Sequence, residues 1–191
     1  MKVIRKSFEI LNKIKSVIRI ILVRLKYSNI EIGFNSYIGK NCRIHCDNDG
    51  KIILKEVYLS DGVVLQARRS GQITIEKCYL GYNSVVVAIE NISIGRDVEI
   101  AEMTVIRDQD HRFDFSDTPI SKQGFYHNPI SIGDNTWIGA KASILKGTTI
   151  GHNCLVGAHS LTREVSFPDG SLVVGTPARI VTKKSNKGSV V

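Results

Sequence analysis

The segment SIGDNTWIGAKASILKGTTIGHNCLVGAHS, residues 131–160, repeats one six-residue unit. An aliphatic residue opens the unit, a Gly or another small residue usually follows it, and a second small residue often lies four positions on. A period of six is neither the two of a strand nor the 3.6 of a helix. It is typical of a parallel β-helix, in which each coil holds three short strands that direct aliphatic side chains inward. The aliphatic positions are Ile132, Ile138, Ile144, Ile150 and Val156.

A longer repeat overlies the hexads and predicts the domain boundaries. Pairs of aliphatic residues recur about once in every three hexads, with a last interval twice as long, at Ile30/Ile32, Ile52/Leu54, Ile73/Ile75, Ile92/Ile94 and Ile130/Ile132. Three hexads and irregular turns account for one coil, and the long interval, which has the length of two coils, holds an insertion at residues 107–129. We therefore predict an all-β fold with a β-helix domain over residues 29–181, a helix over residues 1–28 and a flexible tail over residues 182–191.

The segment 1–28 predicts a basic amphipathic α-helix. Residues 2–27 contain eight Lys and Arg residues against Glu9 alone, a local charge of +7 within a net charge of +8. Apolar residues occupy one half of the helical wheel and most basic residues the other. Such a helix either adsorbs to an anionic membrane surface or packs against the protein or a sister subunit. Because the other residues carry only about +1, the charge does not indicate a nucleic-acid-binding domain.

The cysteines and the N-terminal charges predict a cytoplasmic location. Four cysteines are present without a Cys-x-x-Cys pair, which favours reduced core thiols. Lys and Arg interrupt the apolar residues of the N-terminal segment, so it predicts neither a signal peptide nor a membrane span. The protein is expected in the cytoplasm, either free or peripheral on the inner face of the cytoplasmic membrane.

The insertion carries the motifs that point to chemistry. It contains Asp110-His111, then Pro119-Ile120 and Gln123-Gly124, and it is followed by IGDNTWIGAKASILKGTTIG and VGTPARIV. This ordered set resembles the hexapeptide-repeat acyltransferases, in the branch of the maltose/galactoside and xenobiotic acetyltransferases, and most of all the polysaccharide O-acetyltransferases. The resemblance implies a left-handed β-helix, a homotrimer with active sites between adjacent subunits, and acetyl-CoA as the co-substrate.

The chemistry of acetyl transfer to a hydroxyl fits a histidine in this loop. An alcohol is a poor nucleophile at neutral pH, and an imidazole has a suitable pKa for removing its proton. The resemblance assigns this role of general base to His111. It also implies that the backbone N–H of Ala140 donates to the oxyanion, at a place where the galactoside enzymes have a serine.

Further site residues follow from the resemblance alone. It implies cofactor contacts from Trp137, Ala158, Thr162, Arg163 and Arg179, and substrate contacts from Asn83, Gln123 and His127. The sequence departs from the family pattern near Thr162, where it is one residue short. A packing role in a corner for Trp137, and an ordinary corner position for Asn83, remain open.

The sequence does not predict a metal site. The spacing of its histidines lacks the His-x-x-x-x-His of the γ-class carbonic anhydrases, which share this architecture. One of Asp108, Asp110 and Asp114 is a candidate for orienting His111. We expect an O-acetyltransferase acting on a sugar hydroxyl of a bacterial surface polysaccharide or its precursor. The alternatives are a small-molecule acceptor, such as an antibiotic or a free sugar, and a non-catalytic β-helix scaffold.

Overall fold

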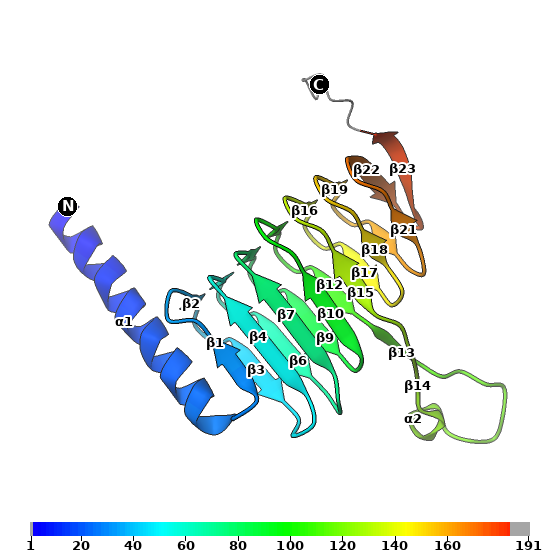
Figure 1. Cartoon of the computed structure of the whole chain (residues 1–191), viewed down its shortest axis with the longest axis horizontal. Coiled ribbons are helices and arrows are strands. Elements are labelled where there is room, and N and C mark those ends of the chain that lie inside the picture. The colour runs from blue at the N-terminus through cyan, green and yellow to red at the C-terminus, as the bar shows by residue number, and fades with distance from the viewer. Residues whose placement is uncertain (1, 184–191) are drawn as a thin grey trace.

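Three parallel sheets form a triangular solenoid with a helix at one end and a long hairpin on one edge (Figure 1). The computed structural model of the chain describes residues 2–183, with side chains over residues 10–181. Each of the first six coils contributes one strand to each of three sheets, which we call A, B and C, and the last coil contributes to sheets A and B. This is the parallel β-helix that the six-residue repeat predicts, in the left-handed form that the family resemblance implies, and the prediction of fold is confirmed.

The strands are short and follow one another in the order A, B, C. Sheet A contains β1 (Ile30–Ile32), β4 (Lys51–Lys55), β7 (Gln72–Glu76), β10 (Asn91–Ile94), β15 (Ile130–Ile132), β18 (Thr149–Ile150) and β21 (Ser166–Phe167). Sheet B contains β2 (Tyr37–Ile38), β5 (Tyr58–Leu59), β8 (Tyr79–Leu80), β11 (Glu99–Ile100), β16 (Trp137–Ile138), β19 (Leu155–Val156), β22 (Ser171–Gly175) and β23 (Ala178–Lys183). Sheet C contains β3 (Arg43–Cys46), β6 (Val64–Ala67), β9 (Val85–Ala88), β12 (Val105–Arg107), β17 (Ser143–Leu145) and β20 (Leu161–Thr162).

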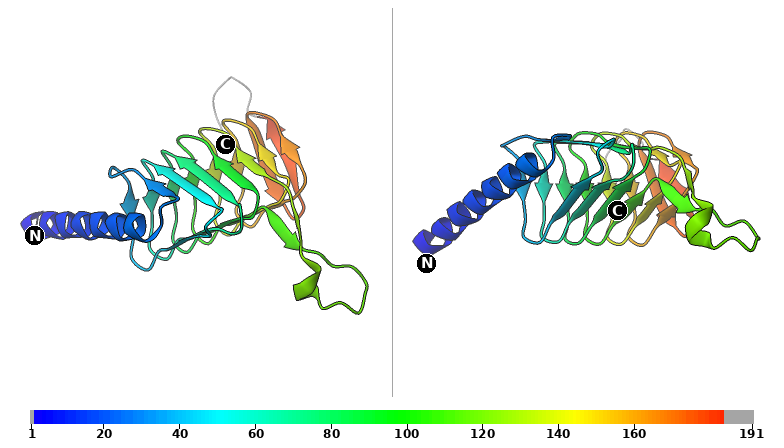
Figure 2. Two further views of the ribbon diagram at one scale, coloured as in Figure 1. Left: turned by 60° about the horizontal axis from the view of Figure 1, so that its bottom comes forward. Right: turned by 90° about the horizontal axis from the view of Figure 1, so that it is seen from below.

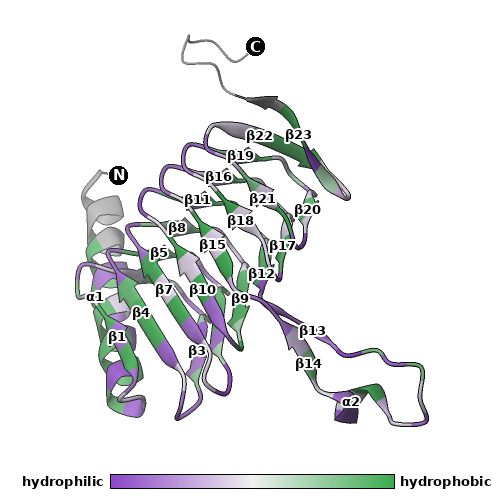
Figure 3. Cartoon of the chain, turned by 45° about the vertical axis from the view of Figure 1, so that its right-hand side comes forward, coloured by the Kyte–Doolittle hydropathy of each residue, from purple (hydrophilic) through white to green (hydrophobic). Residues whose placement is uncertain are grey.

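The aliphatic hexad positions stack in register to form the core. Ile92 of β10 pairs with Ile73 on one side and with Ile130 on the other, and all three are fully buried. Apolar side chains thus run the length of the solenoid, and fully burying each contributes about 1.5–3 kcal/mol. In Figure 3 the strands are largely hydrophobic and many of the connecting corners are hydrophilic.

The corners between strands need a left-handed backbone conformation. In the column of corners between sheets B and C, Asn83, Lys141 and His159 have φ of 57°, 57° and 59°. Each donates its backbone N–H to a carbonyl of the preceding coil, as His159 N does to Ala140 O at 2.9 Å. These bonds fix the vertical spacing of the coils, which is about 4.8 Å.

The helix α1 (Lys2–Lys26) lies across the first coil and covers the open end of the core (Figure 2). Ile20 is fully buried within the core cluster, and the Ser16 hydroxyl accepts a hydrogen bond from Ile38 N at 2.7 Å. Arg19 donates to the Ile38 carbonyl at 3.0 Å. Among the residues that the structure describes, no helix is long and apolar enough to cross a membrane.

The long insertion leaves between β12 and β15 and does not disturb the solenoid. It contains β13 (Gln109–His111), the single-turn helix α2 (Ile120–Gln123) and β14 (Phe125–His127), and it projects away from the coils (Figure 2). Sheet A passes directly from β10 to β15, which accounts for the long interval in the sequence repeat. At the C-terminus, β23 folds back antiparallel on β22 and continues to Lys183, just past the predicted domain end. The rest of the predicted tail lies outside the described residues.

Candidate active site

The hairpin of β13 and β14 presents the loop histidines at the edge where sheet C meets sheet A. The two strands pair antiparallel, with Gln109 opposite His127 and His111 opposite Phe125. The pairing brings the two ends of the insertion together into one small platform. Because β13 follows β12 after a single residue, this platform is attached directly to the fourth coil.

Asp108 is that single residue, and it anchors the hairpin to the coil below. Its side chain is fully buried, and its carboxylate accepts hydrogen bonds from Ile89 N and Glu90 N, both at 2.8 Å. Its carbonyl also accepts a bond from Asn128 N at 3.0 Å, which closes the base of the loop. Burial raises the pKa of the Asp108 carboxyl, and the backbone N–H groups oppose this rise. Asp108 is therefore a structural anchor and does not reach the imidazole of His111.

His111 is exposed on the outer part of this platform. Its ring packs on the ring of Phe125, with 4.4 Å between centroids and a tilt of 40°. Within residues 10–181, no hydrogen bond joins the His111 ring to a carboxylate. Asp114, the third acidic candidate, instead lies 3.3 Å from the Arg112 guanidinium and accepts a bond from the Tyr126 hydroxyl.

Asp110 connects the hairpin to a coil further along the solenoid. Its Oδ2 lies 3.1 Å from Nη2 of Arg163, which lies in the corner after β20 in the sixth coil. The sequence resemblance assigned Arg163 to the cofactor, and the structure pairs it with the residue before His111. Both side chains are part-exposed, so the pair contributes little to stability but restricts where the hairpin lies.

His127 and Gln123 are engaged within the loop and its base. His127 Nδ1 lies 2.8 Å from Glu90 Oε2, a contact that holds β14 to the third coil. The Gln123 amide accepts a bond from Asp114 N at 2.7 Å and donates to Thr118 O at 2.7 Å. Gln123 therefore shapes the loop in this structure. Sequence reasoning missed Arg69, whose guanidinium lies 5.1 Å from the centroid of the Phe125 ring, because Arg69 belongs to a coil far upstream of the insertion.

A second group of predicted residues lies along the opposite edge of sheet C, in the corners that join it to sheet B. Ala140 and Ala158 occupy the second position of consecutive corners, where the earlier coils have Asp61, Tyr82 and Glu102. Among the described residues, no acceptor is hydrogen-bonded to the N–H of Ala140 or Ala158. Ala140 and Ala158 have the shortest side chains at this position of the column, and a backbone N–H without an acceptor is the kind of donor that suits an oxyanion or an amide-containing chain. Asn83 is exposed in the same column of corners, two coils before Ala140.

Trp137 and Arg179 lie on the outer surface of sheet B. Trp137 is 54% exposed and stands in register between Glu99 and Leu155, shortly before Ala140 in the same coil. Arg179 is exposed on β23 and bonds to its neighbour's carbonyl, Ala178 O, at 2.8 Å. Both are therefore open to a ligand that runs along the corner between sheets B and C.

Thr162 is the exception among the predicted cofactor residues. Its side chain is 1% exposed and faces the core, where its hydroxyl accepts a bond from the Thr148 hydroxyl at 3.1 Å. It continues the hexad series that contains Ile150 and Val156, so its direction is set by the repeat. The structure therefore does not bring the Thr162 side chain to the surface with the other predicted cofactor residues.

The two groups do not meet within one chain. The loop group, His111 with Asp110, Arg163 and His127, lies where sheet C joins sheet A, and the corner group, Asn83 with Ala140 and Ala158, lies where sheet C joins sheet B. The short strands of sheet C separate them, which is a width of roughly 10 Å.

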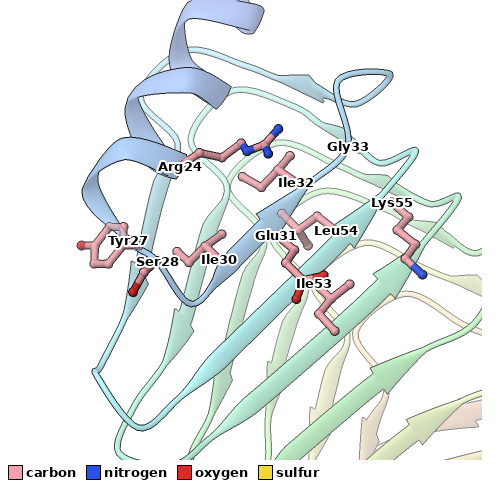
Figure 4. A pocket seen from close by; sticks show the side chains of 10 residues that line it. All are labelled: Arg24, Tyr27, Ser28, Ile30, Glu31, Ile32, Gly33, Ile53, Leu54 and Lys55. Carbon is pink, nitrogen blue, oxygen red and sulfur yellow. The ribbon is translucent and has the colours of Figure 1, made fainter.

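A pocket of about 450 Å³ lies elsewhere, between the end of α1 and the strands β1 and β4 of sheet A (Figure 4). It is lined by Arg24, Tyr27, Ser28, Ile30, Glu31, Ile32, Gly33, Ile53, Leu54 and Lys55. It contains no histidine and none of the predicted site residues, so we do not assign the chemistry to it. In the described part of the chain, no cluster of three His, Cys, Asp or Glu side chains is suited to a metal ion.

Comparison with known proteins agrees with this architecture. Residues 129–163 match the family model described as bacterial transferase hexapeptide (six repeats). The chain is 35% identical over 167 residues to a Mycobacterium tuberculosis protein named as a probable acetyltransferase, covering 85% of this chain but only 55% of that relative. It is 33% identical over 162 residues to WbbJ of Escherichia coli, a protein named as a putative lipopolysaccharide biosynthesis O-acetyl transferase, covering 78% of this chain and 82% of WbbJ.

A solved structure extends the agreement to three dimensions. A variant of the N-acyltransferase AntD from Bacillus cereus superposes with a TM-score of 0.72 at 22% identity, covering 88% of this chain and 90% of AntD. At this identity the likeness concerns the fold alone. It includes the β-helix as a whole, since nearly nine-tenths of each chain are matched.

Proposed function

Because this chain belongs to the hexapeptide-repeat acetyltransferases, we propose that it transfers the acetyl group of acetyl-CoA to a sugar hydroxyl. The observation that carries the proposal is the exposed imidazole of His111 on a hairpin that is fixed at its base by Asp108. Such an imidazole is held in position yet open to an incoming acceptor. A sugar of a bacterial surface polysaccharide or its precursor is the proposed acceptor, a choice supported by the name of the Escherichia coli relative.

The mechanism requires no covalent enzyme intermediate. His111 accepts the hydroxyl proton as the sugar oxygen attacks the thioester carbonyl, and the backbone N–H of Ala140 donates to the oxyanion. When the tetrahedral intermediate collapses, the carbon–sulfur bond breaks and the thiolate of CoA leaves. The imidazolium of His111 returns the proton to that thiolate, so the products are the acetylated sugar and free CoA.

The two separated groups of residues support an active site shared between subunits of a homotrimer. The hairpin of one subunit brings His111 against the corner between sheets B and C of the next, where Ala140 and Ala158 lie. Trp137 and Arg179 then flank the coenzyme on that neighbouring surface. A closed cyclic trimer supplies three such sites.

An assay with different acceptors distinguishes the proposed function from two other readings of the function. The first is an acetyltransferase for a small acceptor such as an antibiotic or a free sugar, and the second is a non-catalytic scaffold. CoA release from acetyl-CoA is measured with a panel of glycans, free sugars and aminoglycosides, and the products are identified by mass spectrometry. The proposed function expects release with oligosaccharides. Release only with small acceptors supports the first reading, and neither release nor binding of acetyl-CoA supports the second.

The proposed acceptor also implies a location. Precursors of surface polysaccharides that are built on a lipid lie at the membrane, and a peripheral enzyme would meet them there. We place the protein on the inner face of the cytoplasmic membrane, with the α1 region as the part that contacts the lipid.

A further inference from the structure

We infer that α1 binds the β-helix and an anionic lipid surface at the same time, through opposite faces. One side of the helix is packed on the first coil. Ser16, Ile20, Val23 and Tyr27 turn toward the first coil, with Ile20 fully buried and Tyr27 bonded through its hydroxyl to His45. With 3.6 residues per turn these positions share one side of the helix.

A continuous apolar stripe occupies the opposite side and faces away from the protein. Its members are 38–80% exposed. With 3.6 residues per turn, these residues occupy less than half of the helical wheel. The centre of this arc lies almost opposite the side that packs on the first coil. The stripe consists of Ile10, Leu11, Ile14, Val17, Ile18, Ile21, Leu22 and Leu25.

Basic residues border the stripe on both sides. Lys13 and Arg24 lie along one border, and Lys15 and Lys26 along the other, all exposed, while the helix contains no acidic residue from Ile10 to Lys26. Apolar residues between two rows of basic residues are the arrangement by which a helix lies in the plane of an anionic bilayer, with the long side chains reaching the phosphates. Charge complementarity therefore identifies a lipid surface as the occupant of the stripe.

The seating of the helix argues against a sister subunit as that occupant. Leu22 and Leu25 lie on the far side of a helix segment whose near side is already packed on its own first coil. In a cyclic trimer with parallel solenoids, a neighbour lies beside this coil and not beyond its end. The three stripes would instead face outward together at one end of the assembly.

This orientation sets the height of the catalytic loop above the lipid. The hairpin leaves the fourth coil and contacts Arg69 of the second coil through Phe125. With about 4.8 Å per coil and about 10 Å for the helix, His111 lies roughly 20 to 25 Å from the stripe. On the proposed function, the acceptor is then an oligosaccharide whose reactive sugar is separated from its lipid by further sugars.

Vesicle binding tests the inference without any assay of activity. The full chain is sedimented with vesicles of phosphatidylcholine, with or without phosphatidylglycerol. We expect binding only with the anionic lipid, at least tenfold weaker for Ile18→Glu/Leu22→Glu. For Lys13→Gln/Lys15→Gln we expect the affinity for the anionic vesicles to fall about 30-fold, because each basic residue contributes a factor of about five.

A matched control separates the two faces of α1. Ile20→Ala should lower the melting temperature, whereas Ile18→Glu/Leu22→Glu should keep the melting temperature and the size of the assembly. If the stripe variant instead unfolds or dissociates, protein covers the stripe and the inference is wrong. Equal binding of wild type and stripe variant to anionic vesicles would overturn it as well.

The distance between the solenoid and the lipid surface is measured with Trp137, the single tryptophan. Energy transfer from Trp137 to a dansyl lipid should be weak in the bound wild type, and strong in Trp137→Phe/Leu22→Trp, in which the donor lies on the stripe. Strong transfer from Trp137 would mean that the solenoid lies flat on the bilayer.

Acetylation of lipid-linked saccharides of different length then tests the acceptor. If no acceptor reacts but vesicle binding holds, the proposed function fails and the lipid-binding role of α1 does not.

Discussion

Arg163 Nη2 lies 3.1 Å from Asp110 Oδ2, so a residue of the sixth coil holds the residue that precedes His111. We expect Arg163→Ala and Asp110→Asn each to lower kcat about tenfold, because the hairpin loses one of its constraints and the imidazole is less well positioned. The double variant should be no worse than either single variant, since both remove the same contact. Additive losses would contradict the positioning role. A rise in KM for acetyl-CoA in Arg163→Ala alone would show that Arg163 contacts the cofactor.

His111→Ala should lower kcat by a factor on the order of 10² to 10⁴, the usual contribution of a general base. Affinity for acetyl-CoA should change little, because His111 lies on the hairpin and not at the corners of sheet B. The measurement is steady-state kinetics together with calorimetric binding of acetyl-CoA. His127→Ala is the matched variant. A larger loss of kcat in His127→Ala than in His111→Ala would mean that His127 is the general base.

Mixing two inactive variants tests whether the site is shared. His111→Ala removes the base, and Ala140→Phe blocks the corner N–H. In a cyclic trimer each mixed ring contains one interface with an intact base and an intact corner, so an equimolar random mixture should recover about a quarter of wild-type activity. The chains are mixed by refolding or co-expression, and each variant alone is the control. No recovery would mean that the two residues act within one subunit or not together.

Asp108 gives a pH dependence with a defined sign. Because burial raises the pKa of its carboxyl in the folded state, protonation of Asp108 adds a pH-dependent contribution to stability that is fully present below the unfolded pKa. This contribution is lost as the pH rises through the folded pKa. The free energy of unfolding of wild type, relative to that of Asp108→Asn, should therefore decrease as the pH rises from acidic to neutral and then stay constant. Urea unfolding of both proteins across that range measures the difference, and an opposite slope would be inconsistent with the raised pKa.

The thiols should be unreactive in the folded protein. Burial raises the pKa of all four cysteines, and that of Cys78 to about 12, so little thiolate exists at pH 8. Titration with a disulfide reagent should detect few thiols before denaturation and four after it. Cys78 should react last, which mass spectrometry of partly labelled protein can follow. Rapid labelling of Cys78 in the native state would show that the third coil opens.

The fold could be predicted from the sequence because its repeat encodes position directly. The aliphatic pairs that recur along the chain are the residues that stack, as Ile92 does on Ile130 across the insertion. Thr162 lies six positions after Val156 and is 1% exposed, so the inward series of the repeat continues past the residues from which it was recognised. The periodicity is a direct guide to the core because every inward position is fixed by the coils on either side.

The geometry of the site depended on contacts that no local pattern encodes. The pairs Asp110–Arg163 and His127–Glu90 join residues from different coils, and each depends on how far the hairpin leans over them. Asp108 was a candidate for orienting His111, and only its burial against Ile89 N and Glu90 N identified it as an anchor. The two roles of α1 were alternatives in the sequence, because a helical wheel does not show which side is packed.

The direct passage of sheet A from β10 to β15 means that the hairpin is an exchangeable cassette. Its ends leave and rejoin the solenoid without shifting the register on either side, and Asp108 closes the junction through backbone groups that any sequence would present. A hairpin of different length or composition could be grafted at the same two points while the scaffold stays unchanged. Acceptor preference could then diverge rapidly in evolution, or be redesigned in the laboratory, on a framework whose stability is determined elsewhere.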